Sequence, residues 1–136
     1  MIAVQYRPFW FKIFDPRLTG RLIAVIIFLF LIALSNALSL IATFSASNIA
    51  AAGQHLLSVL LYALPAYGLM KLNRWARRFE IAYSMLLVVL GFFLMAAFNM
   101  FMGMFIVVTH GLVGIVLLSA KTRELFYPPQ DAEITE

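Results

Sequence analysis

The fold is decided by residues 79–120, FEIAYSMLLVVLGFFLMAAFNMFMGMFIVVTHGLVGIVLLSA, whose one charged residue, Glu80, stands at the start. About forty residues are too many for one perpendicular crossing of a hydrocarbon core roughly 30 Å thick, and they suffice for two short crossings. The turn-forming residues nearest the middle are Asn99 and Gly103. The stretch therefore predicts two membrane helices joined in a tight hairpin at residues 99–103.

Two more apolar runs precede this stretch. The run from Leu22 to Phe44 has no charged residue, and a second run extends from Ile49 to Leu72. At a rise of 1.5 Å per residue, each is long enough to cross the hydrocarbon core. Pro65 lies inside the second run, where proline usually kinks a membrane helix. We predict four transmembrane helices, at about 21–44, 49–72, 79–98 and 102–120.

The composition agrees with a membrane protein. Of the 136 residues, 64% are hydrophobic and only 12% are charged, whereas about a quarter of a soluble domain is charged. The chain has no cysteine, which excludes disulfides and thiolate-ligated metal centres. We therefore predict an all-α membrane protein, a four-transmembrane-helix bundle that forms a single membrane domain over residues 1–136.

The ten basic residues predict the orientation. They form three clusters: Arg7, Lys12, Arg17 and Arg21; Lys71, Arg74, Arg77 and Arg78; and Lys121 with Arg123. With four spans all three clusters lie on one side, and the positive-inside rule makes that side cytoplasmic. We therefore predict cytoplasmic N and C termini. We also predict that the protein is integral to a prokaryotic inner (plasma) membrane. The net charge of +4 indicates contact with the lipid bilayer, most directly through the second cluster, and nothing indicates nucleic acid.

The segments outside the predicted spans are short. Residues 6–16 place aromatic side chains beside basic ones, which is typical of an interfacial anchor. A docking surface for a partner is the functional alternative. Residues 121–136 are predicted to be a cytoplasmic tail, and their acidic end is typical of a disordered terminus.

Three polar residues inside the predicted spans are candidate contacts. An ionisable residue near the middle of a membrane helix, such as His110, is a functional candidate by default. A hydrogen bond to a polar side chain on another helix is the simpler explanation, and Asn36 is the partner we expect. His55 lies about one turn into the second helix. Two histidines could bind one haem axially, but they differ in depth, and we expect no cofactor and no metal.

Small residues recur at helical spacing on two predicted helices. Such stripes let helix backbones approach closely, which is how membrane helices associate without a hydrophobic driving force. They are candidate internal packing faces, and the same residues could form a homo-oligomer interface: Ser35, Ser39 and Ala42 on the first helix, and Gly103, Gly111 and Gly114 on the fourth.

Several chemistries lack their residues in this sequence. All six acidic residues lie in or next to the predicted cytoplasmic segments, so we expect no carboxylate in the bilayer, which argues against exporters that depend on an embedded glutamate. There is no phosphate-binding glycine loop, no His-Glu-x-x-His and no nucleophile elbow. We therefore expect that the protein is not an enzyme.

Two segments carry a resemblance. YGLMKLNRWARR, residues 67–78, and LLSAKTRELF, residues 117–126, resemble segments of small uncharacterised prokaryotic four-helix membrane proteins. The resemblance implies the same topology and no particular activity.

Two hypotheses of function remain open at this point. The first is a structural or accessory subunit of a larger membrane complex, with other membrane subunits as partners. The second is a homo-oligomeric small channel or carrier, in which the chain partners itself and Asn36, His55 and His110 belong to a polar lining.

Overall fold

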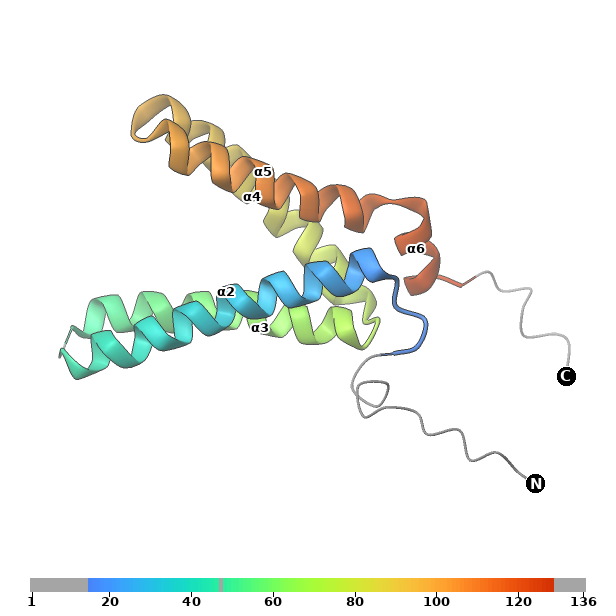
Figure 1. Ribbon diagram of the computed structural model, residues 1–136, viewed down its shortest axis with the longest axis horizontal. Coiled ribbons are helices and arrows are strands. Elements are labelled where there is room, and N and C mark those ends of the chain that lie inside the picture. The colour runs from blue at the N-terminus through green and yellow to red at the C-terminus, as the bar shows by residue number, and fades with distance from the viewer. Residues whose placement is uncertain (1–14, 47, 129–136) are drawn as a thin grey trace, which may run out of the picture.

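The computed structural model describes residues 15–46 and 48–128. Within these ranges the chain is all-helical and has no strand (Figure 1). Four helices are long and apolar enough to cross a membrane, so this is a multi-pass membrane protein. The helices are α2 (Gly20–Ser45), α3 (Ile49–Met70), α4 (Arg74–Ala97), α5 (Met100–Leu118) and the short α6 (Ala120–Phe126).

Side-chain caps mark where most of these helices begin. The first backbone N–H groups of a helix have no partner within it, so a preceding Ser, Thr or Asn that accepts a hydrogen bond stabilises the start. The caps are Thr19 for α2, Asn48 for α3, Asn99 for α5 and Ser119 for α6. The break predicted at residues 99–103 is confirmed, because α4 ends at Ala97 and Asn99 caps α5.

The structure differs from the predicted boundaries in two places. Helix α4 begins at Arg74 instead of residue 79, so it includes a full basic turn that hydropathy alone assigned to a loop. Residues 121–126, predicted as tail, belong to α6, which begins at Ala120 and whose start is capped by the Ser119 hydroxyl. The predicted interfacial segment, 6–16, lies outside the described residues except at its last two positions. The bend expected at Pro65, which is buried inside a continuous α3, stays a prediction.

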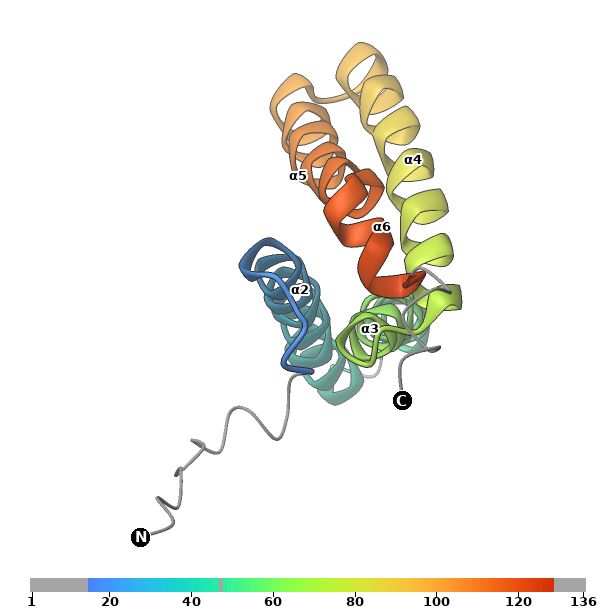
Figure 2. The same cartoon turned by 90° about the vertical axis from the view of Figure 1, so that its right-hand side faces the viewer.

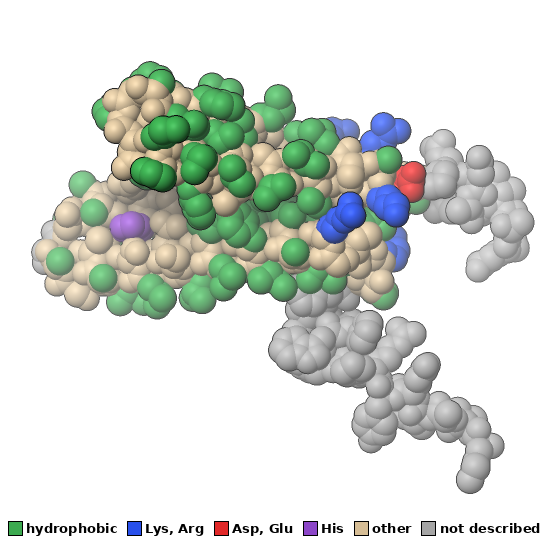
Figure 3. All heavy atoms as spheres, turned by 45° about the horizontal axis from the view of Figure 1, so that its top comes forward, with side chains coloured by type: hydrophobic (Ala, Val, Ile, Leu, Met, Phe, Trp, Pro, Cys, Tyr) green, Lys and Arg blue, Asp and Glu red, His purple; other side chains and the backbone are tan. Residues whose placement is uncertain are grey.

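The four long helices form two antiparallel hairpins, α2 with α3 and α4 with α5, which diverge like the arms of a V (Figures 1 and 2). They meet at the end that holds the start of α2, the α3–α4 connection and α6, where Lys and Arg side chains gather (Figure 3). We call this the basic end. The hydrophobic core lies toward it and includes Leu22, Ile26, Leu29, Leu69 and Leu117. Toward the opposite loops the hairpins separate, so one closed bundle is not confirmed.

The α3–α4 connection joins the hairpins tightly. Asn73 N–H donates to the Gly68 carbonyl at 2.8 Å, closing the end of α3. A Cβ on Gly68 would lie 2.5 Å from the Cβ of Ala76, so the missing side chain permits close approach of α3 and α4. Leu72 has φ 53°, a left-handed conformation that costs a branched side chain energy.

Candidate functional site

A buried carboxyl group lies in α4, toward the basic end of the molecule. Glu80 has no exposed surface. Ser84 Oγ donates to Glu80 Oε1 at 3.4 Å, while Glu80 Oε2 has no hydrogen-bond partner in the described part of the chain. Glu80 lies in α4, one of the helices long and apolar enough to cross a membrane, and the expectation that no carboxylate lies in the bilayer stays a prediction. The early start of α4 puts Glu80 almost two turns inside the helix.

An aromatic cluster surrounds a buried histidine. His110 on α5 is 5% exposed, and its Nδ1 has no partner among the described residues. Its Nε2 lies 3.5 Å from the hydroxyl oxygen of Tyr62 on α3. The rings of Tyr62, Tyr83 and Phe28 have centroids 6.1, 6.3 and 6.4 Å from that of His110. Side chains from all four long helices thus meet at His110.

The predicted pairing of Asn36 with His110 is wrong. Asn36 instead contacts His55, with 3.2 Å between Asn36 Oδ1 and His55 Nδ1. Distance along each helix from the basic end explains this pairing. Asn36 and His55 both lie roughly 23 Å from that end, whereas His110 and Tyr62 both lie roughly 12 Å from it. Counting residues along each helix from the basic end would have matched the depths of the residues in both pairs.

The predicted basic cluster ties α4 to the C-terminal segment. Arg77 Nε donates to the Leu117 carbonyl at 3.0 Å, and Arg74 Nε donates to the Phe126 carbonyl at 3.1 Å. The guanidinium groups of Arg74, Arg77 and Arg78 lie 5.0, 5.8 and 5.9 Å from the centroid of the Tyr127 ring. Such cation–π contacts stabilise a cation over an aromatic face. Lys71, the fourth member, is exposed. Sequence reasoning missed Tyr127 because nothing in its spacing indicates α4.

The two predicted small-residue faces behave differently. On α5, Gly103 packs against α4, because a Cβ there would lie 2.5 Å from the Gly91 carbonyl oxygen. Gly111 has open space beside it, and the nearest atom to a Cβ on Gly114 would be that of Ser84, at 4.0 Å. A groove of about 270 Å³ runs there between α4 and α5, with His110 among its lining residues.

The small residues of α2 are left largely uncovered. Ser35 and Ala42 are exposed and Ser39 is half-buried. The hydroxyl of Ser39 donates to the carbonyl of Ser35 in its own helix, at 3.1 Å. This face therefore does not pack tightly within the chain.

The arrangement limits the chemistry of the described residues. Among them no group of three His, Asp or Glu side chains could hold a metal ion. A carboxyl group and an imidazole can each bind or release a proton, and each has one hydroxyl group beside it: that of Ser84 at Glu80 and that of Tyr62 at His110.

Comparison with known proteins does not assign the chain to a family. No protein family, curated protein or solved structure matches this chain. Function has to be inferred from the geometry of the chain itself.

Proposed function

We propose that this chain is a non-catalytic structural or accessory subunit of a larger membrane complex. The observation that carries the proposal is the open V, in which each hairpin is well packed but the two hairpins join only toward the basic end (Figure 1). Four helices that formed a self-sufficient unit would be expected to pack along their length. An incomplete bundle can be completed by the helices of other subunits.

The small residues of α2 support this proposal. In lipid, helices associate through close van der Waals packing and interhelical hydrogen bonds, so an uncovered stripe of small residues suits another membrane helix. Ser35 and Ala42 are exposed on the outer half of α2. We infer that this face receives a helix of a partner subunit.

The charge pattern supports an orientation for the subunit. The Lys and Arg residues of the described chain lie at or just before the start of α2, in the α3–α4 connection, in the first two turns of α4 and in α6. Under the positive-inside rule these segments and both termini lie in the cytoplasm, and we propose the prokaryotic inner membrane as the location. Accessibility of single cysteines introduced at Lys121 and at Asn48 to a membrane-impermeant thiol reagent, in intact cells, tests the orientation. Labelling at position 48 alone is expected.

The subunit proposal is tested by native mass determination of the tagged chain, extracted gently at its natural expression level. Recovery with other membrane proteins in a fixed ratio is the expected result. Ala42→Leu should release the partner, whereas Ala96→Leu, at an exposed position of α4, should not. A clean homo-oligomer, or equal partner recovery with both variants, would contradict the proposal.

The second candidate is a homo-oligomeric channel or carrier, and one observation favours it. Glu80 and His110 are both buried and each has an unpartnered polar atom, and ionisable groups inside membrane segments often belong to proton or ion pathways. Flux through proteoliposomes should fall at least about tenfold in Glu80→Gln if the carboxyl group takes part. Equal flux in Glu80→Gln, His110→Ala and the parent chain would exclude the role of both groups.

A further inference from the structure

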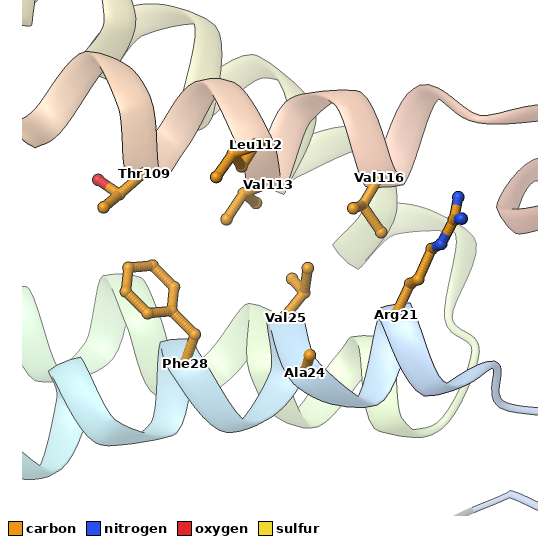
Figure 4. Close-up of a pocket in the computed structure, with 8 residues that line it drawn as sticks. All are labelled: Arg21, Ala24, Val25, Phe28, Thr109, Leu112, Val113 and Val116. Carbon is orange, nitrogen blue, oxygen red and sulfur yellow. The ribbon is translucent and has the colours of Figure 1, made fainter.

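An apolar groove lies between α2 and α5, on the side of the molecule where the two hairpins face each other. It has a volume of about 420 Å³ and extends from Arg21 to Phe28 on α2 and from Thr109 to Val116 on α5. Figure 4 shows Phe28 and Val25 across the gap from Thr109, Leu112 and Val113. Apart from Arg21 and Thr109 its lining residues are apolar. The volume lies in the range of ligand sites.

A second cavity continues the groove at the basic end. It has a volume of about 480 Å³ and is lined by Thr19, Gly20 and Arg21 of the α2 start and by residues 119–122 around the start of α6. Arg21 lines both cavities, and in Figure 4 its side chain extends from the groove toward the end of α5. Lys121 is the other cation that lines the second cavity. The two cavities therefore form one elongated site with an apolar part and a cationic, polar part.

Neither cation is neutralised by the part of the chain that the structure describes. The ion pair found there joins Arg17 and Asp15, and neither cavity has an acidic lining residue. The site thus has two positive charges at one end of an apolar groove. This combination matches a molecule with an anionic head and a hydrocarbon tail.

We propose that this site binds one anionic phospholipid, with its phosphate beside Arg21 and Lys121 and part of an acyl chain in the groove between α2 and α5. The acyl chain leaves one hydrocarbon environment for another, so the tail gains little from the transfer itself. Preference for this lipid over a zwitterionic one comes from the two charges at the headgroup. The groove positions the acyl chain, because Val25 and Phe28 face Leu112 and Val113 across it.

The test uses the full chain in nanodiscs with equal amounts of phosphatidylglycerol and phosphatidylcholine. After gentle release, native mass spectrometry measures which lipid stays bound. The parent chain should retain one phosphatidylglycerol in preference to phosphatidylcholine. Arg21→Gln with Lys121→Gln should reduce that preference about fivefold for each charge removed. Arg123→Gln is the matched control, since it removes an exposed charge from α6 that lines neither cavity.

A second variant tests the groove. Ala24 is an exposed residue that lines the groove, so Ala24→Phe should fill part of it and reduce retention of phosphatidylglycerol while both cations remain. The thermal transition of each variant, measured in the same detergent, shows whether it still folds. If Ala24→Phe does not fold, Thr109→Met serves as the groove variant.

Four results would overturn the proposal. The first is equal lipid preference in the cavity variant and the Arg123 variant, which would mean general attraction to the membrane surface, and the second is undiminished retention of phosphatidylglycerol in the groove variant. The third is displacement of the lipid by inorganic phosphate alone at millimolar concentration, which would mean a phosphate site without a tail. The fourth is a protein helix bound in the groove instead of lipid. Loss of anionic preference in the charge variants together with reduced retention in the groove variant supports it.

Discussion

The glycines of α5 allow one prediction in which the structure separates two chemically identical changes. Gly103→Ala and Gly111→Ala both add a methyl group to the same helix. At Gly103 the new Cβ would lie 2.5 Å from the Gly91 carbonyl oxygen and 2.5 Å from the backbone nitrogen of Met95. At Gly111 nothing lies within 4 Å. The first change should destabilise the α4–α5 hairpin, and the second should not.

The magnitude follows from two opposing terms. Replacing glycine by alanine inside a helix gains about 1 kcal/mol of helix propensity at either position. Overpacking a filled interface costs about 1–3 kcal/mol. The cost at Gly103 should lie near the upper end, because the obstacles are backbone atoms that move only if the helices separate. We expect Gly103→Ala to be about 2–3 kcal/mol less stable than Gly111→Ala.

The measurement is unfolding of the purified chain in mild-detergent micelles by increasing fractions of sodium dodecyl sulfate. The chain has no cysteine, so single cysteines can be introduced at the α4–α5 interface as probes of helix separation. The parent, Gly103→Ala and Gly111→Ala are compared under one condition. Coincident unfolding curves for the two variants would refute the close approach of α4 and α5 at Gly103.

Three further predictions use the same unfolding measurement. Glu80→Leu should raise stability by about 1–3 kcal/mol, because it removes a buried carboxyl group with an unpartnered oxygen; a loss of stability would mean that the carboxyl group has a partner. Alanine substitutions of Asn36 and His55, singly and together, should give a coupling energy of about 0.6 kcal/mol, and a coupling of zero would exclude their hydrogen bond. Leu72→Gly should raise stability by about 1 kcal/mol, because glycine adopts the left-handed backbone without steric cost, and a loss of stability would contradict this.

Much of the secondary structure could be predicted from the sequence. Long uncharged runs and the turn residues between them determined where helices cross the membrane, and the Asn99 break was found in this way. The start of α4 was not found, because a basic turn such as residues 74–78 reads as loop on hydropathy although it is helical. Hydropathy measures affinity for lipid and does not report whether a residue at the helix end continues the helix.

The candidate site was predictable only in part. His110 was selected for its depth, and it is buried. Its contacts depend on how each helix is rotated about its axis, which the sequence of an almost wholly apolar helix leaves undetermined. Glu80 was set aside because it stood at the edge of an apolar run, and its burial results from tertiary packing. The V arrangement also has no sequence signal, since each hairpin alone satisfies the hydropathy pattern.

The division into two hairpins has a consequence for how the protein enters the membrane. Each hairpin consists of consecutive helices joined by an uncharged turn, at residues 46–48 and 98–99. In the proposed orientation only a few neutral residues are translocated with each pair, which avoids the large cost of moving a charge through hydrocarbon. The first hairpin can be inserted and packed while the second is still being synthesised, and joining the two at the basic end then becomes the last step of biogenesis.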